Sequence, residues 1–208
     1  MIELLTADTP NGKKISIMLE EINYDYKVTK ININKDEQFK PEFKKLSPFS
    51  KIPVIIDHET KTSLFESGAI LIYLGEKSGK FYDKDNRTVI NQWLMGQMAY
   101  VGPMLGQHHQ FHHYNPGKSE FGENRYFKIS ERIYRELDER LSQSTFLASN
   151  EYTIADIATF PWIARHEWHD IGLKKFKNLN RWYDEISNRE AVKKGYDLLK
   201  KGDIIPKA

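Results

Sequence analysis

The segment Thr9-Pro10-Asn11-Gly12 combines polar side chains and turn residues at the point where a helix is predicted to begin. The first turn of a helix carries unpaired N–H groups and the positive end of the helix dipole, and both favour an anion. The Thr9 hydroxyl, the Asn11 amide and the backbone N–H groups of Asn11 and Gly12 are donors that suit a thiolate. An ordinary N-terminal cap is the alternative interpretation.

Two further segments carry residues suited to an amino-acid ligand, Lys51-Ile52-Pro53-Val54 and Glu66-Ser67-Gly68-Ala69-Ile70. An exposed strand edge before a proline can pair with an extended peptide through main-chain hydrogen bonds. Ser67 at a helix start can hold a carboxylate, and Glu66 beside it can hold an ammonium group. The pair therefore suits a head group with both charges. A strand start and a helix capped by Ser67 are the alternative interpretations.

A third candidate is a histidine cluster, in which four of the seven histidines fall close together. On a helix, His108/His112 and His109/His113 would form i, i+4 pairs, a geometry that can bind a metal. No carboxylate lies among them, and the glycines and proline just before them argue against a continuous helix. We therefore expect the wall of a ligand cleft and no metal site, with a solvated loop as the remaining alternative.

The apolar pattern predicts elements of two kinds that could position these residues. Up to residue 77 it predicts strands at 2–7, 26–33, 52–56 and 63–65, and helices at 15–22, 38–46 and 67–77. After a linker at 79–85 it predicts only helices, at 88–105, 122–141, 153–166, 178–188 and 191–200. The expected organisation is an α/β domain over 1–80 followed by an all-helical domain over 87–208.

Composition narrows the class of protein. The 208 residues contain 31 Lys and Arg against 29 Asp and Glu, a net charge of +2, which argues against a nucleic-acid partner. No apolar run approaches the roughly 18 residues that span a bilayer, and no signal-peptide pattern opens the chain. We expect a cytoplasmic protein without membrane contact. Because the chain has no cysteine, any thiol chemistry must use a thiol that a ligand supplies.

The order of the motifs resembles the cytosolic glutathione transferases over essentially the whole chain. The motifs are Ile-Pro-Val at 52–54, Glu-Ser-Gly-Ala-Ile at 66–70 and Thr-Ile-Ala-Asp at 153–156. Three others are similar to the bacterial Nu class, Thr-Pro-Asn-Gly at 9–12, Ser-Pro-Phe-Ser-Lys-Ile-Pro at 47–53 and Gly-Pro-Met-Leu-Gly-Gln at 102–107.

The resemblance implies a thioredoxin-like α/β N-terminal domain, an all-α C-terminal domain, a homodimer and a glutathione site without a metal. By position, Thr9 and Asn11 would lie near the sulfur. The remaining residues implied to bind the tripeptide are Gln38, Lys51, Ile52, a cis Pro53, Glu66, Ser67 and Arg132. Many relatives activate the thiol with Tyr, Ser or Cys at the end of the first strand, where this chain has Thr6 and Ala7.

The resemblance also implies an activity, the glutathione-dependent reduction of small disulfides. One oxidised or two reduced glutathione molecules would occupy the site, and conjugation would be weak. Two other functions stay open: a transferase that conjugates glutathione to carbon electrophiles, and a non-catalytic glutathione-binding regulatory dimer.

Overall fold

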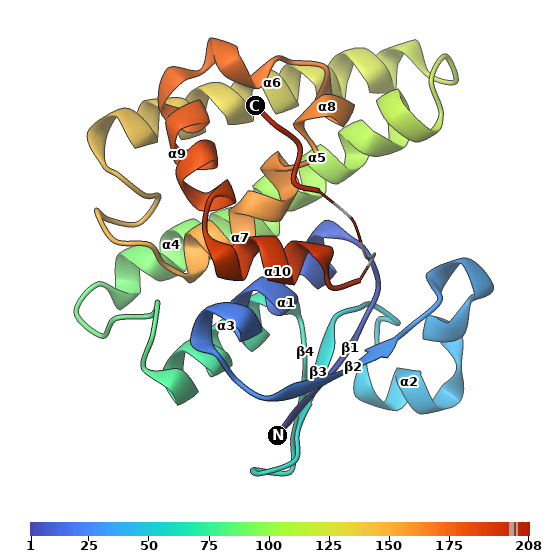
Figure 1. The fold of residues 1–208 in the computed structure, drawn as a ribbon. Helices are drawn as coiled ribbons and strands as arrows, with labels where there is room; N and C mark the ends of the chain where they lie inside the picture. Colours follow the sequence, from blue (N-terminus) through green and yellow to red (C-terminus); the bar gives the residue numbers. More distant parts are fainter. Residues whose placement is uncertain (200–201, 203) are drawn as a thin grey trace. The chain divides into compact units, whose positions relative to one another are not determined.

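The computed structural model describes residues 1–199, 202 and 204–208, and the chain divides into two compact units (Figure 1). The sheet unit comprises residues 1–82 and 189–204, and the helical unit comprises residues 83–188 and 205–208. Within the described residues, no helix is long and apolar enough to cross a membrane.

The sheet unit contains four strands in the order β2-β1-β3-β4. Their bounds are Ile2–Thr6 (β1), Tyr26–Lys30 (β2), Val54–Asp57 (β3) and Thr62–Phe65 (β4). β1 pairs parallel with β2 and antiparallel with β3, and β3 pairs antiparallel with β4. A parallel pair requires a crossover, which the helix α1, Pro10–Ile22, provides. The predicted strands are confirmed, with shifted ends.

Alternating side chains of the strands face opposite sides of this sheet. Leu5 and its partner Val54 form one buried cluster with Phe43 of helix α2, Pro41–Leu46. Helix α3, Ser67–Ser78, packs against α1 and against the strands β3 and β4. The predicted strand at 26–33 ends at Lys30, and two short 3₁₀ turns follow it, Ile33–Lys35 and Glu37–Phe39.

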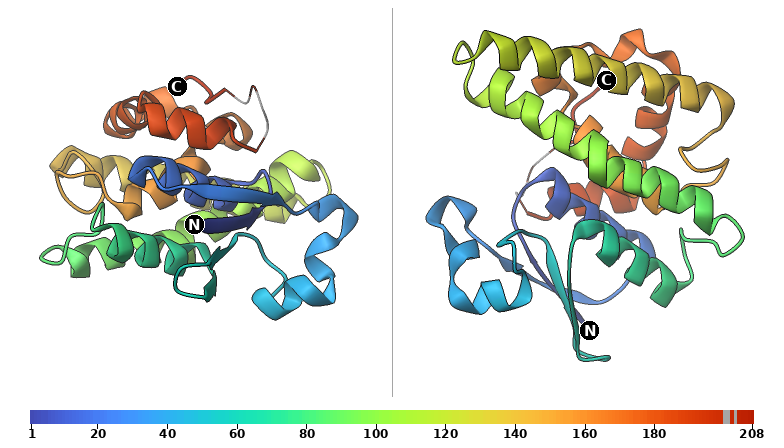
Figure 2. Two further views of the ribbon diagram at one scale, coloured as in Figure 1. Left: turned by 60° about the horizontal axis from the view of Figure 1, so that its bottom comes forward. Right: turned by 180° about the vertical axis from the view of Figure 1, so that it is seen from behind.

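The sheet unit also contains a helix from the far end of the chain. Helix α10, Glu190–Asp197, lies alongside α1 in the views of Figures 1 and 2. The expected division at 80 and 87 placed this helix with the all-helical domain, whereas its packing places it in the sheet unit. The predicted end of this helix at Lys200 lies outside the described residues.

The helical unit is built around a buried helix. Its elements are α4 (Arg87–Gly96), a π-helix (Gln97–Val101), α5 (Gly102–His108), a second π-helix (His109–Tyr114), α6 (Glu120–Gln143), α7 (Ile154–Ile163), α8 (His166–His169), a 3₁₀ turn (Leu173–Lys175) and α9 (Lys177–Ser187). Every residue of α7 is buried. The buried Asp156 accepts hydrogen bonds from Thr153 N, Leu147 N and Trp182 Nε1, which explains this acid without a catalytic role.

Candidate active site

The loop between β1 and α1 presents a hydroxyl at a helix N-terminus. Thr9 has an extended backbone and is the N-cap of α1, and its Oγ1 accepts a hydrogen bond of 3.1 Å from Gly12 N. Pro10 occupies the first helical position, where the missing N–H costs nothing. Because Oγ1 accepts from Gly12, the hydroxyl proton of Thr9 remains for donation to another group.

The prediction that the Gly12 N–H donates to the thiolate is wrong, because this N–H forms the capping hydrogen bond with Thr9 Oγ1. Gly12 is instead required by close packing. A Cβ there would lie 2.2 Å from Ala7 O and 2.5 Å from Thr6 Oγ1, so the first turn of α1 rests directly on the end of β1. Thr6 is fully buried and donates to Ala7 O, so its hydroxyl is not presented by the loop.

The turn before β3 is held by one buried serine. Ser47 Oγ donates to Lys51 O at 2.8 Å and accepts from Lys51 N at 3.1 Å. The peptide bond between Ile52 and Pro53 is cis, as expected. The pairing of β3 with β1 runs from Asp57 to Val54, so the main chain of Ile52 lies beyond the last pair of this ladder. This position is consistent with main-chain pairing to an extended peptide.

Glu66 and Ser67 lie between β4 and α3. Glu66, with φ of 68°, is the N-cap residue and is exposed, and Ser67 is the first helical residue and is buried. The alternative interpretation of Ser67 as the helix cap is therefore wrong by one position, because Glu66 is the N-cap residue. The positive φ turns the chain sharply at Glu66, so that its carboxylate stands in solvent while Ser67 Oγ faces inward.

A buried lysine, Lys14, lies behind these two residues and was missed in the sequence. Its Nζ lies 3.4 Å from Ser67 Oγ. Burial lowers the pKa of Lys14 to about 7, and the nearby Glu66 carboxylate partly opposes that shift. Lys14 follows Asn11 by three positions and precedes Met18 by four, so it shares the buried face of α1. A lysine on a buried helix face is uncommon, and this position was the sequence signal that could have identified Lys14.

The other two predicted glutathione residues lie on separate elements. Gln38 belongs to the turn Glu37–Phe39, and its Nε2 donates to Ile33 O at 3.4 Å. Arg132 is exposed on α6, in the helical unit. The sheet unit thus contains all the predicted site residues except Arg132. Their contacts with glutathione stay predictions.

The segment that carries the four clustered histidines is helical. The expected interruption of the helix before these histidines is therefore wrong, and so is the alternative of a solvated loop. His108 and His109 are buried where α5 meets the second π-helix. The cleft-wall interpretation stays a prediction. Among the described residues, no three acidic or histidine side chains are grouped so as to hold a metal.

These histidines form a hydrogen-bonded aromatic cluster. Tyr134 Oη and His169 Nδ1 are 2.6 Å apart, and His169 Nε2 and His109 Nε2 are 2.8 Å apart. His108 Nε2 contacts His169 O at 3.0 Å. Burial lowers the pKa of His109 to about 3 and that of His169 well below its usual value, so both imidazoles are neutral near pH 7.

This cluster predicts acid sensitivity. Because His109 binds its proton less readily when folded, the unfolded chain takes up more protons below its ordinary pKa of about 6.5. His109 should therefore lower the free energy of unfolding by about 1.4 kcal/mol for each pH unit between its ordinary pKa of about 6.5 and its folded pKa of about 3. Denaturation of wild type and His109→Phe at pH 7, 6 and 5 measures the slope, which should fall in the variant. The half-exposed His58, changed to Gln, is the control.

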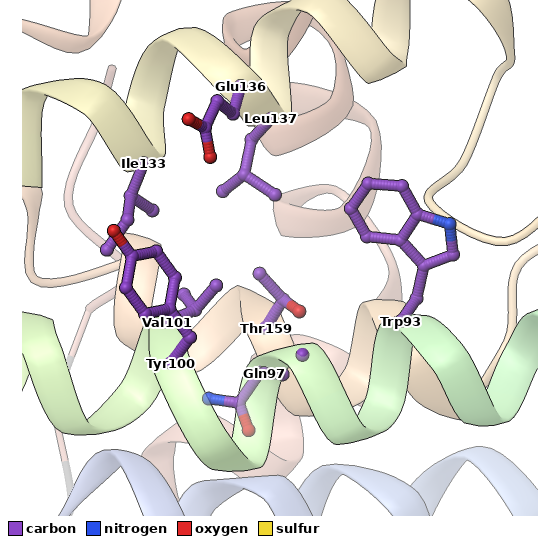
Figure 3. Close-up of a pocket in the computed structure, with 9 residues that line it drawn as sticks. Trp93, Gln97, Tyr100, Val101, Ile133, Glu136, Leu137 and Thr159 are labelled. Carbon is purple, nitrogen blue, oxygen red and sulfur yellow. The ribbon is translucent and has the colours of Figure 1, made fainter.

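The helical unit also contains a small apolar cavity of about 160 Å³ (Figure 3). Its lining residues come from α4, the π-helix that follows it, α6 and α7: Trp93, Gly96, Gln97, Tyr100, Val101, Ile133, Glu136, Leu137 and Thr159. Figure 3 shows Trp93 and Tyr100 on opposite sides of this space. None of the predicted glutathione residues lines the cavity.

Comparison with known families identifies the fold. The glutathione S-transferase N-terminal domain matches residues 3–76, and the glutathione S-transferase C-terminal domain matches residues 109–190. The chain belongs to the glutathione S-transferase family. It is an enzyme of this family, with a glutathione-dependent function and the expected thioredoxin-like and all-helical domains.

Named relatives are similar along nearly the whole chain. The disulfide-bond oxidoreductase YfcG of Escherichia coli is 42% identical over 207 residues, which are 96% of this chain and 95% of that one. The disulfide-bond oxidoreductase YghU of the same organism is 37% identical and covers 93% of this chain and 73% of its own length.

Two solved structures show what similar proteins bind. A Burkholderia graminis glutathione transferase with two glutathione molecules per subunit is 37% identical with a TM-score of 0.91, covering 97% of this chain and 89% of its own. A Pseudomonas putida glutathione transferase with one glutathione disulfide per subunit is 40% identical with a TM-score of 0.88, covering 97% and 91%.

Proposed function

We propose that this glutathione transferase reduces small disulfides with bound glutathione as the only source of thiol. The observation that carries the proposal is the loop at Thr9, which presents a hydroxyl at a helix N-terminus in a chain without cysteine. The similarity to two disulfide-bond oxidoreductases supports it. The protein would also be a homodimer, and light scattering at micromolar concentration tests that part.

Glutathione would bind across the sheet unit. The main chain of Ile52 would pair with the cysteinyl residue, and Glu66 and Ser67 would hold the ammonium and carboxylate of the γ-glutamyl group. Lys51, with Gln38, would face the glycine carboxylate. This arrangement would place the sulfur beside Thr9 and Asn11.

The reaction would proceed by two exchanges. Donation from Thr9 and Asn11 and the field of the α1 N-terminus would stabilise the thiolate, which is the nucleophile. It would attack one sulfur of the substrate disulfide, forming a mixed disulfide and releasing the other sulfur as a thiolate that takes up a proton. A second glutathione thiolate would then attack the glutathione sulfur, giving oxidised glutathione and the second substrate thiol.

A paired assay separates this function from conjugation. We expect rapid, enzyme-dependent reduction of a small disulfide such as 2-hydroxyethyl disulfide, and a far slower reaction of an aromatic halide, each with millimolar glutathione. Faster conjugation than reduction would identify a conjugating transferase. Glutathione binding by calorimetry without either activity would identify a binding protein, and no binding of reduced or oxidised glutathione would refute the site itself.

A further inference from the structure

One buried side chain, Lys13, connects the C-terminal helix with the loop that carries Thr9. Its Nζ donates to Tyr196 O at 2.6 Å, lies 3.8 Å from the centre of the Tyr196 ring and pairs with Asp8 Oδ1 at 3.0 Å. The side chain of Lys13 is fully buried, whereas that of Asp8 is 30% exposed. Asp8 directly precedes Thr9 in the chain.

Helix α10 lies close enough to α1 for this contact because of Gly195. A Cβ at Gly195 would lie 2.6 Å from both the Cα and the N of Ile17, so the two helix backbones meet there. Ser16 Oγ donates to Gly195 O at 2.6 Å. Carbonyl groups at the end of a helix lack helical partners and carry the negative end of its dipole, so Tyr196 O suits a buried ammonium.

The ammonium of Lys13 has three protons, and its surroundings offer a carbonyl, a carboxylate and a ring face. A buried charge that loses one such partner is strongly destabilised, so the lysine resists displacement from this position. Because Asp8 is one of the partners, the same forces fix the backbone next to Thr9.

We propose that Lys13 is a positioning residue of the thiol–disulfide reaction, a role that rests on the proposed function. Held by Tyr196 and Asp8, it fixes the loop that directs the Thr9 hydroxyl toward the glutathione sulfur. Lys13 itself does not touch the substrate. Small misplacements of a catalytic group cost as much as about 100-fold in rate. The residues proposed to bind the rest of the tripeptide, Ile52, Glu66 and Ser67, lie on other elements.

The test compares Lys13→Met, Asp8→Asn and the double variant in the disulfide assay. We expect each single variant to lower kcat about tenfold or more, with the KM for glutathione changed less than about threefold. Since both substitutions remove the same ion pair, the double variant should be no slower than the worse single variant. The absorbance of the thiolate of bound glutathione near 240 nm should titrate at higher pH in both single variants.

Ser16→Ala is the matched control, because it removes a hydrogen bond between α1 and α10 without contacting Asp8. It should lower the melting temperature and leave kcat unchanged. If Ser16→Ala slows turnover as much as Lys13→Met, or if Asp8→Asn keeps full kcat and an unshifted thiolate titration, the positioning role is refuted. Asp8→Asn decides the question should Lys13→Met not fold. A wild-type protein inactive on disulfides would refute the proposed function instead, a result visible before any variant is made.

Discussion

Thr9→Ala is expected to lower disulfide turnover by about 10- to 100-fold. The substitution removes a charge-assisted hydrogen bond to the thiolate, worth roughly 1.5–3 kcal/mol. Glutathione binding should weaken much less, because Ile52, Glu66 and Ser67 hold the remainder of the tripeptide. The steady-state rate with a small disulfide, measured over a range of glutathione concentrations, separates the effect on kcat from that on KM.

Two companion variants sharpen this result. Thr9 also caps α1, and loss of the cap costs about 1 kcal/mol of stability. Thr9→Ser keeps both the cap and the donor, so it should retain most of the turnover. Asn11→Ala tests whether the stabilisation of the thiolate is shared: a comparable loss means that it is. Full turnover in both Thr9→Ala and Asn11→Ala would show that the helix N-terminus acts without these side chains.

The sheet unit was predictable because its elements follow local patterns. Apolar runs located β1 and β3, alternation of apolar residues located β2, and a three-residue segment at 63–65 located β4, while the apolar spacing located α1 and α3. The first site motif was equally local, since a threonine before Pro10 at the start of a helix is an N-cap by its own chemistry. The family motifs then added which ligand such a loop serves.

The contacts of α10 could not be predicted in this way. Lys13 and Tyr196 are 183 positions apart, and because lysines are almost always exposed, the residue type does not predict that Lys13 is buried. In the sequence, Gly195 is a helix-weakening residue within a short amphipathic helix. Only its contact with the backbone of Ile17 explains why a glycine stands there. Tertiary packing, which composition and periodicity do not encode, decides all of these positions.

The histidine segment shows a different failure. Glycine and proline normally interrupt helices, and here Pro103 is accommodated in the first turn of α5. The π-helical residues on either side of α5 keep the path helical, so that His108 and His109 turn inward. The prediction of a loop followed from the local helix breakers. It could not take account of the aromatic side chains that pack on His109, among them Trp162 and Trp168.

Glu66→Gln is expected to have the opposite kinetic effect to Thr9→Ala, raising the glutathione requirement and sparing the maximal rate. Glu66 is exposed at the start of α3, where its carboxylate is proposed to bind the ammonium of the γ-glutamyl group. Loss of this charge-assisted contact costs roughly 1.5–3 kcal/mol, so the KM for glutathione should rise about 10- to 100-fold. Gln keeps the size and backbone of the residue, which isolates the charge.

The sulfur lies at the other end of the proposed site, so saturating glutathione should restore turnover in Glu66→Gln to within about twofold of wild type. A γ-glutamyl analogue without the amino group provides a second control. It should bind wild type weakly and should lose little further affinity in the variant, because the contact is already absent. A fall in kcat at unchanged KM would place Glu66 in the chemical step and contradict the proposed orientation of glutathione. An equal loss of affinity for the analogue would mean that Glu66 acts on the structure of the turn at the start of α3 and not on the ammonium.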